Sequence, residues 1–197
     1  MIKKSIFYIS ILLTVAFISS GFKQFKSPLN DNNLEEENYV SLNIPFTAKY
    51  FIGFKEAIAR KESQGEYKKI NTLGYLGKYQ FGMETLKSIG INDSITFINS
   101  PKLQEKAFVV LLSKNKYELQ DYINDFEGKI IDGVKITESG ILAAAHLGGT
   151  GSVKRFLDSN GERKCKDEYG TSVRTYMKDF GGYETDGIKA IKDAKVK

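Results

Sequence analysis

The chain has 197 residues, 41% of them hydrophobic and only three of them proline, so it is neither disordered nor fibrous. Its net charge of +5 is mild, and no stripe of lysine and arginine with interleaved aromatic residues indicates a nucleic-acid partner. With a single cysteine, Cys165, and a single histidine, His146, an intramolecular disulfide and an ordinary zinc cluster are excluded. We expect neither a metal nor another cofactor.

The first 20 residues are typical of a secretory signal. Lys3 and Lys4 give a charged start, the apolar run 6–18 follows, and small residues then offer a cleavage site. The run is shorter than the ~20 residues of a membrane-spanning helix, which favours removal of the signal over an uncleaved anchor. We therefore expect export to the periplasm, the cell envelope or the medium. Residues 21–43 are polar and aperiodic and are interpreted as a linker or a disordered mature N-terminus.

Residues 44–185 are enough for one domain with its own core, and their apolar pattern predicts a mainly helical fold. Short strands are expected near Ile70 and Tyr75, and a turn or small hairpin over 126–134. The lysine-rich end, residues 186–197, is interpreted as a solvated tail. The predicted helices cover residues 46–60, 81–89, 101–122, 137–146, 153–157 and 171–180.

The stretch from Arg60 to Gly82 contains the strongest candidate for chemistry. Glu62 stands at the end of the first predicted helix, and a polar loop with repeated glycines follows it. The partial negative charge at a helix C-terminus disfavours a carboxylate there and so favours the protonated acid. General-acid cleavage of a glycosidic bond requires such an acid. The alternative is an ordinary solvated glutamate at a fraying helix end.

Three segments, in order, resemble the catalytic region of the lysozyme superfamily, and most of all the soluble lytic transglycosylases and related peptidoglycan hydrolases. The first is ESQG from Glu62, and the second is GYLGKYQF over 74–81, in which Gln80 follows Glu62 at the family's interval. The third, ILAAAHLGGTG over 141–151, is similar to the family's A-A-Y-N-A-G-x-G motif. It has Ala145 in place of tyrosine and His146 in place of asparagine, and its glycine loop is one residue longer.

The resemblance implies an α+β, lysozyme-like fold with a glycan-binding cleft. It also implies cleavage of the β-1,4 bond between N-acetylmuramic acid and N-acetylglucosamine in peptidoglycan strands, with Glu62 as the catalytic acid. We expect a monomer without a membrane span once the signal is removed. The residues expected to contact the glycan are Ser63, Tyr75, Gly77, Gln80, His146, Thr171, Tyr176 and Tyr183.

Several of these residues have a structural alternative. Gln80 carries amide donors and an acceptor that suit an N-acetyl group, or it ties down its own loop. Tyr75 lines a groove or belongs to the core. His146 contacts sugar, orients Glu62 or makes a structural hydrogen bond. Thr171 faces the cleft or caps a helix.

The family has a tyrosine near its C-terminal end that bonds the catalytic glutamate, and Tyr176 and Tyr183 are the candidates here. No second acid falls within the three segments. Because hydrolysis needs two carboxylates, a lone glutamate favours a lytic transglycosylase. In such an enzyme Glu62 acts first as an acid and then as a base on the sugar's own C6 hydroxyl. The acids outside the segments are candidates with nothing to choose between them: Glu66, Asp93, Asp167 and Asp179.

Other functions stay open at this point. A lysozyme-type hydrolase would use the same glutamate with a second acid. A non-catalytic peptidoglycan-binding module would keep the groove without turnover, although a binder does not need the acid. A toxin or penetration device aimed at another cell's wall would use the same chemistry, so the sequence does not separate it from a housekeeping enzyme.

Overall fold

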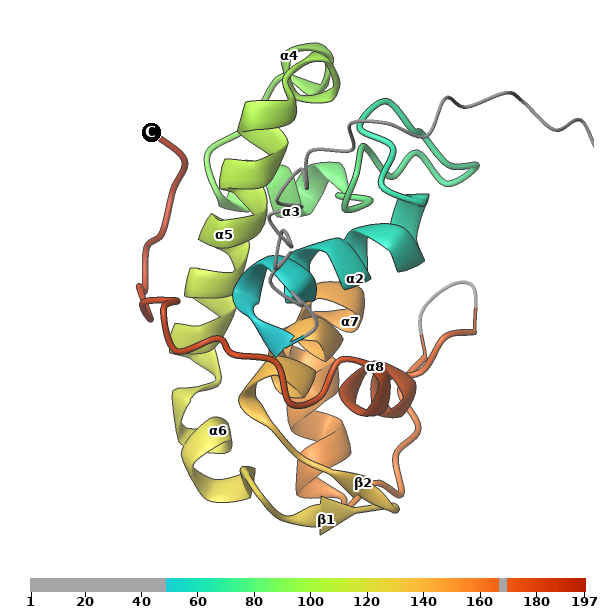
Figure 1. The fold of residues 1–197 in the computed structure, drawn as a ribbon, viewed down its shortest axis with the longest axis vertical. Helices are drawn as coiled ribbons and strands as arrows, with labels where there is room; N and C mark the ends of the chain where they lie inside the picture. Colours follow the sequence, from blue (N-terminus) through green and yellow to red (C-terminus); the bar gives the residue numbers. More distant parts are fainter. Residues whose placement is uncertain (1–48, 167–169) are drawn as a thin grey trace, which may run out of the picture. The chain divides into compact units, whose positions relative to one another are not determined.

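The computed structural model describes residues 49–166 and 170–197, and all of them belong to one compact unit (Figure 1). The predicted signal over 1–20 and the predicted linker over 21–43 lie outside these residues. The described part is mainly helical, which confirms the prediction of a mainly helical fold. Within it, no helix is long and apolar enough to cross a membrane.

The first half of the domain contains four helices: α2 (Phe51–Ser63), α3 (Met83–Ser88), α4 (Ser94–Asn99) and α5 (Pro101–Glu118). The Ser100 side chain accepts a hydrogen bond from the backbone N–H of Leu103 and Pro101 opens α5, as predicted. The short helix α4 was not predicted. It is capped by Asp93, whose carboxylate accepts from two backbone N–H groups of the first turn.

The second half begins with α6 (Gln120–Phe126), because the long helix predicted over 101–122 breaks at Leu119. The predicted hairpin is present as β1 (Ile130–Ile131) and β2 (Val134–Lys135), an antiparallel pair. Its two turn residues both have positive φ, as a tight two-residue hairpin requires. Instead of strands near Ile70 and Tyr75, the loop after α2 forms only isolated bridges.

Helix α7 (Glu138–Asp158) is the centre of the domain and packs against α5, α6 and α8 (Val173–Asp179) (Figure 1). The run from Ser139 to Ala145 is entirely buried, as in a helix surrounded by protein. A non-helical backbone at Gly149 divides α7 and accounts for the two separate helices that were predicted. Gly140 lets α8 approach closely, since a Cβ there would lie 2.6 Å from the Met177 carbonyl oxygen.

The interpretation of the last residues as a solvated tail is wrong. Their lysines are exposed, but Ile188 and Ala194 are buried. The backbone N–H of Ile191 donates to the Ser113 carbonyl, and that of Val196 donates to the Ile89 carbonyl. Apolar residues between the lysines thus hold the segment against the body of the domain, where it runs beside α5 (Figure 1).

Candidate active site

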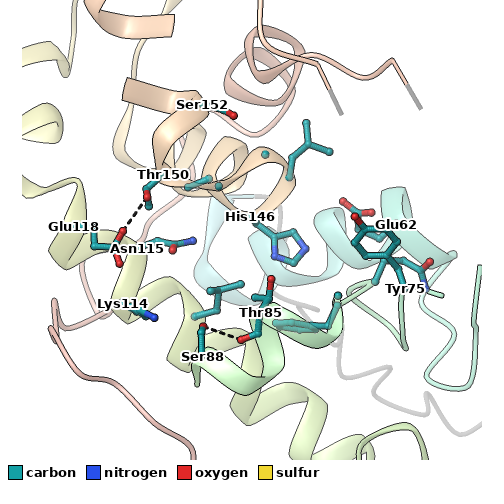
Figure 2. A pocket seen from close by; sticks show the side chains of 18 of the residues that line it. Glu62, Tyr75, Thr85, Ser88, Lys114, Asn115, Glu118, His146, Thr150 and Ser152 are labelled. Carbon is teal, nitrogen blue, oxygen red and sulfur yellow. Dashed lines mark hydrogen bonds between the residues drawn. The ribbon is translucent and has the colours of Figure 1, made fainter. Parts of the chain in front are cut away.

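A cavity of about 640 Å³ lies beside the C-terminal end of α2 (Figure 2). The three segments singled out in the sequence all contribute to its wall, although they are far apart along the chain. Helix α5 closes another side. The polar and aromatic residues of its wall include Glu62, Tyr75, Gln80, Lys114, Asn115, Glu118, His146 and Thr150.

Glu62 lies in the last turn of α2, as predicted, and is half-buried. The buried phenol of Tyr176, on α8, donates a hydrogen bond of 2.6 Å to its Oε1. The other carboxyl oxygen, Oε2, is therefore the one available to a ligand in the cavity. Of the two tyrosines predicted as partners of Glu62, Tyr176 is confirmed.

Tyr183 is not a partner of Glu62, so that half of the prediction is wrong. Its ring packs 5.7 Å from the ring of Phe54, and the Lys49 ammonium lies over it at 4.6 Å from the centroid. Tyr183 does not line the cavity. The reason is its position beyond the end of α8, where the chain has turned back toward the start of α2.

His146 lies in the cavity wall, with its ring edge-on to Phe81 and Phe108. Its Nε2 is 2.9 Å from the Tyr79 carbonyl oxygen. A carbonyl only accepts, so Nε2 carries the proton and Nδ1 is an acceptor. Nδ1 is buried and has no hydrogen-bond partner among the described residues. Burial lowers the pKa of the imidazole, although the charge of Glu62 and the Tyr79 carbonyl act in the opposite direction, so His146 is neutral at pH 7.

Gln80 ties down its own loop, as one of the two interpretations predicted, and it also lines the cavity. Its side-chain amide nitrogen donates to the Gly77 carbonyl at 2.8 Å and so ties down its own loop. Its side chain also lines the cavity, and the amide oxygen is the atom left for a ligand. The backbone of Gln80 has a positive φ of 49°, which is unusual for a residue other than glycine and accompanies functional sites. Tyr75, from the same loop, lines the cavity as expected.

Ser63, Gly77 and Thr171 do not line the cavity, so the structure gives no support to the prediction that they contact glycan. Ser63 is fully buried, and its hydroxyl donates to the Lys78 carbonyl at 2.7 Å. At Gly77 an added Cβ would lie 2.2 Å from the Gln104 side-chain oxygen. Ser63 and Gly77 therefore shape the loop rather than bind a ligand, while Thr171 directly precedes Ser172, the N-cap of α8.

An ionic cluster around the buried Lys78 anchors the loop and was not predicted. Lys78 is only 4% exposed, and its ammonium donates to Glu56 at 2.6 Å and to Glu105 at 2.9 Å. Burial would raise the pKa of the Glu105 carboxyl, but hydrogen bonds from Lys55, Lys78, Tyr67 and Tyr79 outweigh it and hold this pKa at about 2. A lysine is rarely so buried unless it is paired. The cluster fixes the loop residues next to Gln80 onto α5.

The cavity residues on α5 were also missed. Lys114, Asn115 and Glu118 lie on one face of this helix, where residues three and four apart are neighbours. The Thr150 hydroxyl, from α7, donates to the Glu118 carboxylate at 2.8 Å. Figure 2 shows Glu118 and Glu62 on opposite sides of His146. The helical spacing of these three polar residues of α5 was the signal that could have indicated this wall.

None of the described acids proposed as a second carboxylate lies at the cavity. Asp93 caps α4, and its carboxyl pKa is lowered by the hydrogen bonds it accepts from Thr96 and Ile95. Asp179 is 3.9 Å from Lys61 at the surface. Glu66 is exposed and does not line the cavity, and Asp167 lies outside the described residues.

Comparisons with family models, with curated proteins and with solved structures found no match to this chain. Within residues 49–166 and 170–197, no group of three or more His, Cys, Asp or Glu side chains is placed to hold a metal ion. What distinguishes the cavity is the geometry around Glu62, where the three sequence segments meet.

Proposed function

We propose that this protein is an exported enzyme that cleaves the β-1,4 bond between N-acetylmuramic acid and N-acetylglucosamine in peptidoglycan, as a lytic transglycosylase. The observation that carries the proposal is the half-buried Glu62 carboxyl in a cavity, held by the buried phenol of Tyr176. The three segments that resemble the lysozyme superfamily all reach the wall of this cavity. A carboxyl with an orienting partner in a concave site is the usual arrangement for acid–base catalysis.

In the first step, Glu62 gives its proton to the bridging oxygen while the bond from that oxygen to the sugar C1 breaks. Oε2 is the oxygen that delivers the proton, because Oε1 accepts the hydrogen bond from Tyr176. In the second step, the C6 hydroxyl of the same sugar attacks C1 and loses its proton to the Glu62 carboxylate. The carboxyl is restored, no water is consumed and the product is a 1,6-anhydro sugar. A tethered hydroxyl competes well with external water because its effective concentration is high.

Three other residues of the cavity wall supply the contacts that hold the sugar. The Gln80 amide oxygen accepts from an N–H or hydroxyl group, since its amide nitrogen is engaged by Gly77. The unprotonated Nδ1 of His146 is a second acceptor. Tyr75 offers an aromatic ring at the cavity wall, against which the apolar face of a sugar ring packs.

The decisive test is Glu62→Gln, which keeps the shape of the side chain and removes the proton donor. We expect cleavage of purified sacculi to fall by at least ~100-fold, the usual contribution of a general acid, with an unchanged thermal unfolding midpoint. Glu66→Gln is the matched control, because Glu66 is a nearby exposed glutamate outside the cavity. Clearance of sacculi by Glu62→Gln at a near wild-type rate would exclude the proposal.

Mass spectrometry of the released muropeptides distinguishes transglycosylation from hydrolysis. The proposal requires 1,6-anhydro ends, which are lighter by one water than hydrolysed ends. Reducing ends as the main product would favour a lysozyme-type hydrolase, which needs a second carboxylate. Glu118 would then be the residue to test, since it is the other carboxylate that lines the cavity within the described part of the chain.

A further inference from the structure

The α5 wall of the cavity contains a buried amide whose donor group has no partner. Asn115 is only 6% exposed, lines the cavity, and its Nδ2 makes no hydrogen bond to any described residue. Burying an amide donor without a partner is unfavourable, and a native structure that retains one calls for an explanation. A ligand group that accepts a hydrogen bond from Asn115 would provide the missing partner.

Charged groups of opposite sign lie beside this amide. Lys114 and Glu118 also line the cavity from α5, and neither takes part in an ion pair within the described residues. Thr150 donates to Oε2 of Glu118, which leaves the other carboxylate oxygen for a ligand (Figure 2). The wall therefore presents an ammonium, an amide and a carboxylate in a row along one helix.

This combination fits a peptide better than a sugar. The N-acetylglucosamine ring carries hydroxyls and one acetamido group and has no charge. The peptide attached to N-acetylmuramic acid contains several amides with carboxylates beside them, and commonly a free amine. A carboxylate of the peptide can pair with the Lys114 ammonium, and an amide carbonyl can accept a hydrogen bond from Asn115. A free amine can pair with the Glu118 carboxylate.

We propose that the α5 wall, formed by Lys114, Asn115, Glu118 and Thr150, binds the peptide substituent of the glycan strand. The inference rests on the proposed function, because it assigns a second part of the same substrate to the same cavity. Glu62 acts on the glycosidic bond at one side of His146, and the peptide is held at the other. The enzyme would thus prefer strands that still carry peptides over strands from which peptides have been removed.

The test measures binding without turnover, in protein that carries Glu62→Gln. One probe is a disaccharide tetrapeptide muropeptide, and the other is the same disaccharide after an amidase has removed its peptide. We expect calorimetry to show about tenfold tighter binding of the peptide-bearing probe, as for one or two hydrogen bonds to charged or buried groups. Asn115→Leu in the same protein should abolish this difference.

Thermal unfolding and two further variants, Asn92→Leu and Glu118→Gln, distinguish a loss of binding from a loss of folding. Asn115→Leu removes an unpartnered buried amide, so its thermal unfolding midpoint should rise rather than fall. Asn92→Leu is the control, because it makes the same change at an exposed residue outside the cavity. Glu118→Gln keeps its shape and loses its charge, and it should reduce the preference for the peptide-bearing probe even if Asn115→Leu fails to fold.

Three results would overturn the inference. Equal affinity for the two probes would show that the peptide is not recognised. If Asn115→Leu weakened binding of both probes equally, the α5 wall would bind the sugar rather than the peptide. Failure of both probes to bind would also exclude it, and cleavage of sacculi by the wild-type protein, measured in parallel, would show whether the proposed function fails as well.

Discussion

At the residue scale, the position of the Glu62 carboxyl depends on one phenol from another helix. Tyr176 is buried, and its ring packs against Phe180 with centroids 4.9 Å apart. A packed aromatic ring has little rotamer freedom, so its hydroxyl is a fixed donor to Oε1. Fixing Oε1 also fixes the direction of Oε2, from which the proposed proton transfer takes place.

Tyr176→Phe removes the phenol and keeps the packed ring. We expect kcat/KM for sacculi to fall about tenfold, because a catalytic group that loses its orienting hydrogen bond spends less time in the productive position. The free energy of unfolding should fall by no more than about 1.5 kcal/mol. Tyr183→Phe is the control, since that ring packs on Phe54 away from the cavity. Equal losses in both variants would argue against a specific role for Tyr176.

At the element scale, the approach of α7 to α8 brings Tyr176 to Glu62, and Gly140 permits that approach. Gly140→Ala would place a Cβ 2.6 Å from the Met177 carbonyl oxygen, a backbone atom that cannot move alone. We expect a loss of about 1–3 kcal/mol in the free energy of unfolding, as for other overpacked sites. Urea unfolding measures this loss.

The matched control for Gly140→Ala is Gly151→Ala, in the second part of the same helix. There the nearest atom outside the helix backbone is the flexible Arg155 guanidinium, at 3.6 Å. Because alanine has the higher helix propensity, this change should raise stability by about 0.5–1 kcal/mol. If both substitutions stabilise the protein, close packing of α7 on α8 is not the reason for glycine at position 140.

At the scale of the whole molecule, the ionic cluster under the loop makes stability depend on pH. The Glu105 carboxyl has an ordinary pKa of 4.5 and a pKa of about 2 in the folded protein. Between these values the unfolded chain binds a proton that the folded chain does not, so stability falls as the pH is lowered from 4.5 toward 2. His146 adds a further loss of stability as the pH falls below its ordinary pKa of 6.5. Burial lowers its pKa in the folded protein, so the unfolded chain binds a proton there first.

Urea unfolding at a series of pH values tests this dependence. Glu105→Gln is expected to be less stable than the wild type at pH 7, because Lys78 loses a charged partner in a buried position. The difference between the two proteins should shrink as the pH falls through the window from 4.5 to about 2. A constant difference across that window would show that the cluster does not lower the pKa of Glu105 in the folded protein.

Much of the fold could be predicted because helix boundaries depend on neighbouring residues. Ser100 with Pro101, Thr137 and Ser172 each cap a helix through contacts within three positions. The break at Leu119 was not visible, since the apolar pattern continues through it. Helix α4 was too short for its periodicity to be recognised, although Asp93 is a good capping residue.

Apart from Tyr176, which the family resemblance suggested as a partner of Glu62, the site was predicted only where a local motif carried it. Glu62, Tyr75, Gln80 and His146 belong to recognisable segments, and all four line the cavity. Ser63 shares such a segment but lies on the buried side of α2, so a motif alone does not tell which side chains face a ligand. The Lys78 cluster depends on pairs far apart along the chain, which a single sequence does not reveal. The α5 wall has a local signal in its spacing, but only the fold shows that this face of α5 meets the cavity.

The hydrogen bond between Tyr176 and Glu62 joins residues 114 positions apart. Closing a loop of that length has an entropic cost that forming a single helix does not, and contacts between distant residues slow folding. A partly folded chain can therefore contain helices while Glu62 still lacks its partner. During refolding, recovery of the proposed wall-cleaving activity should lag behind the far-ultraviolet helix signal, because Glu62 gains its partner only when α8 has docked.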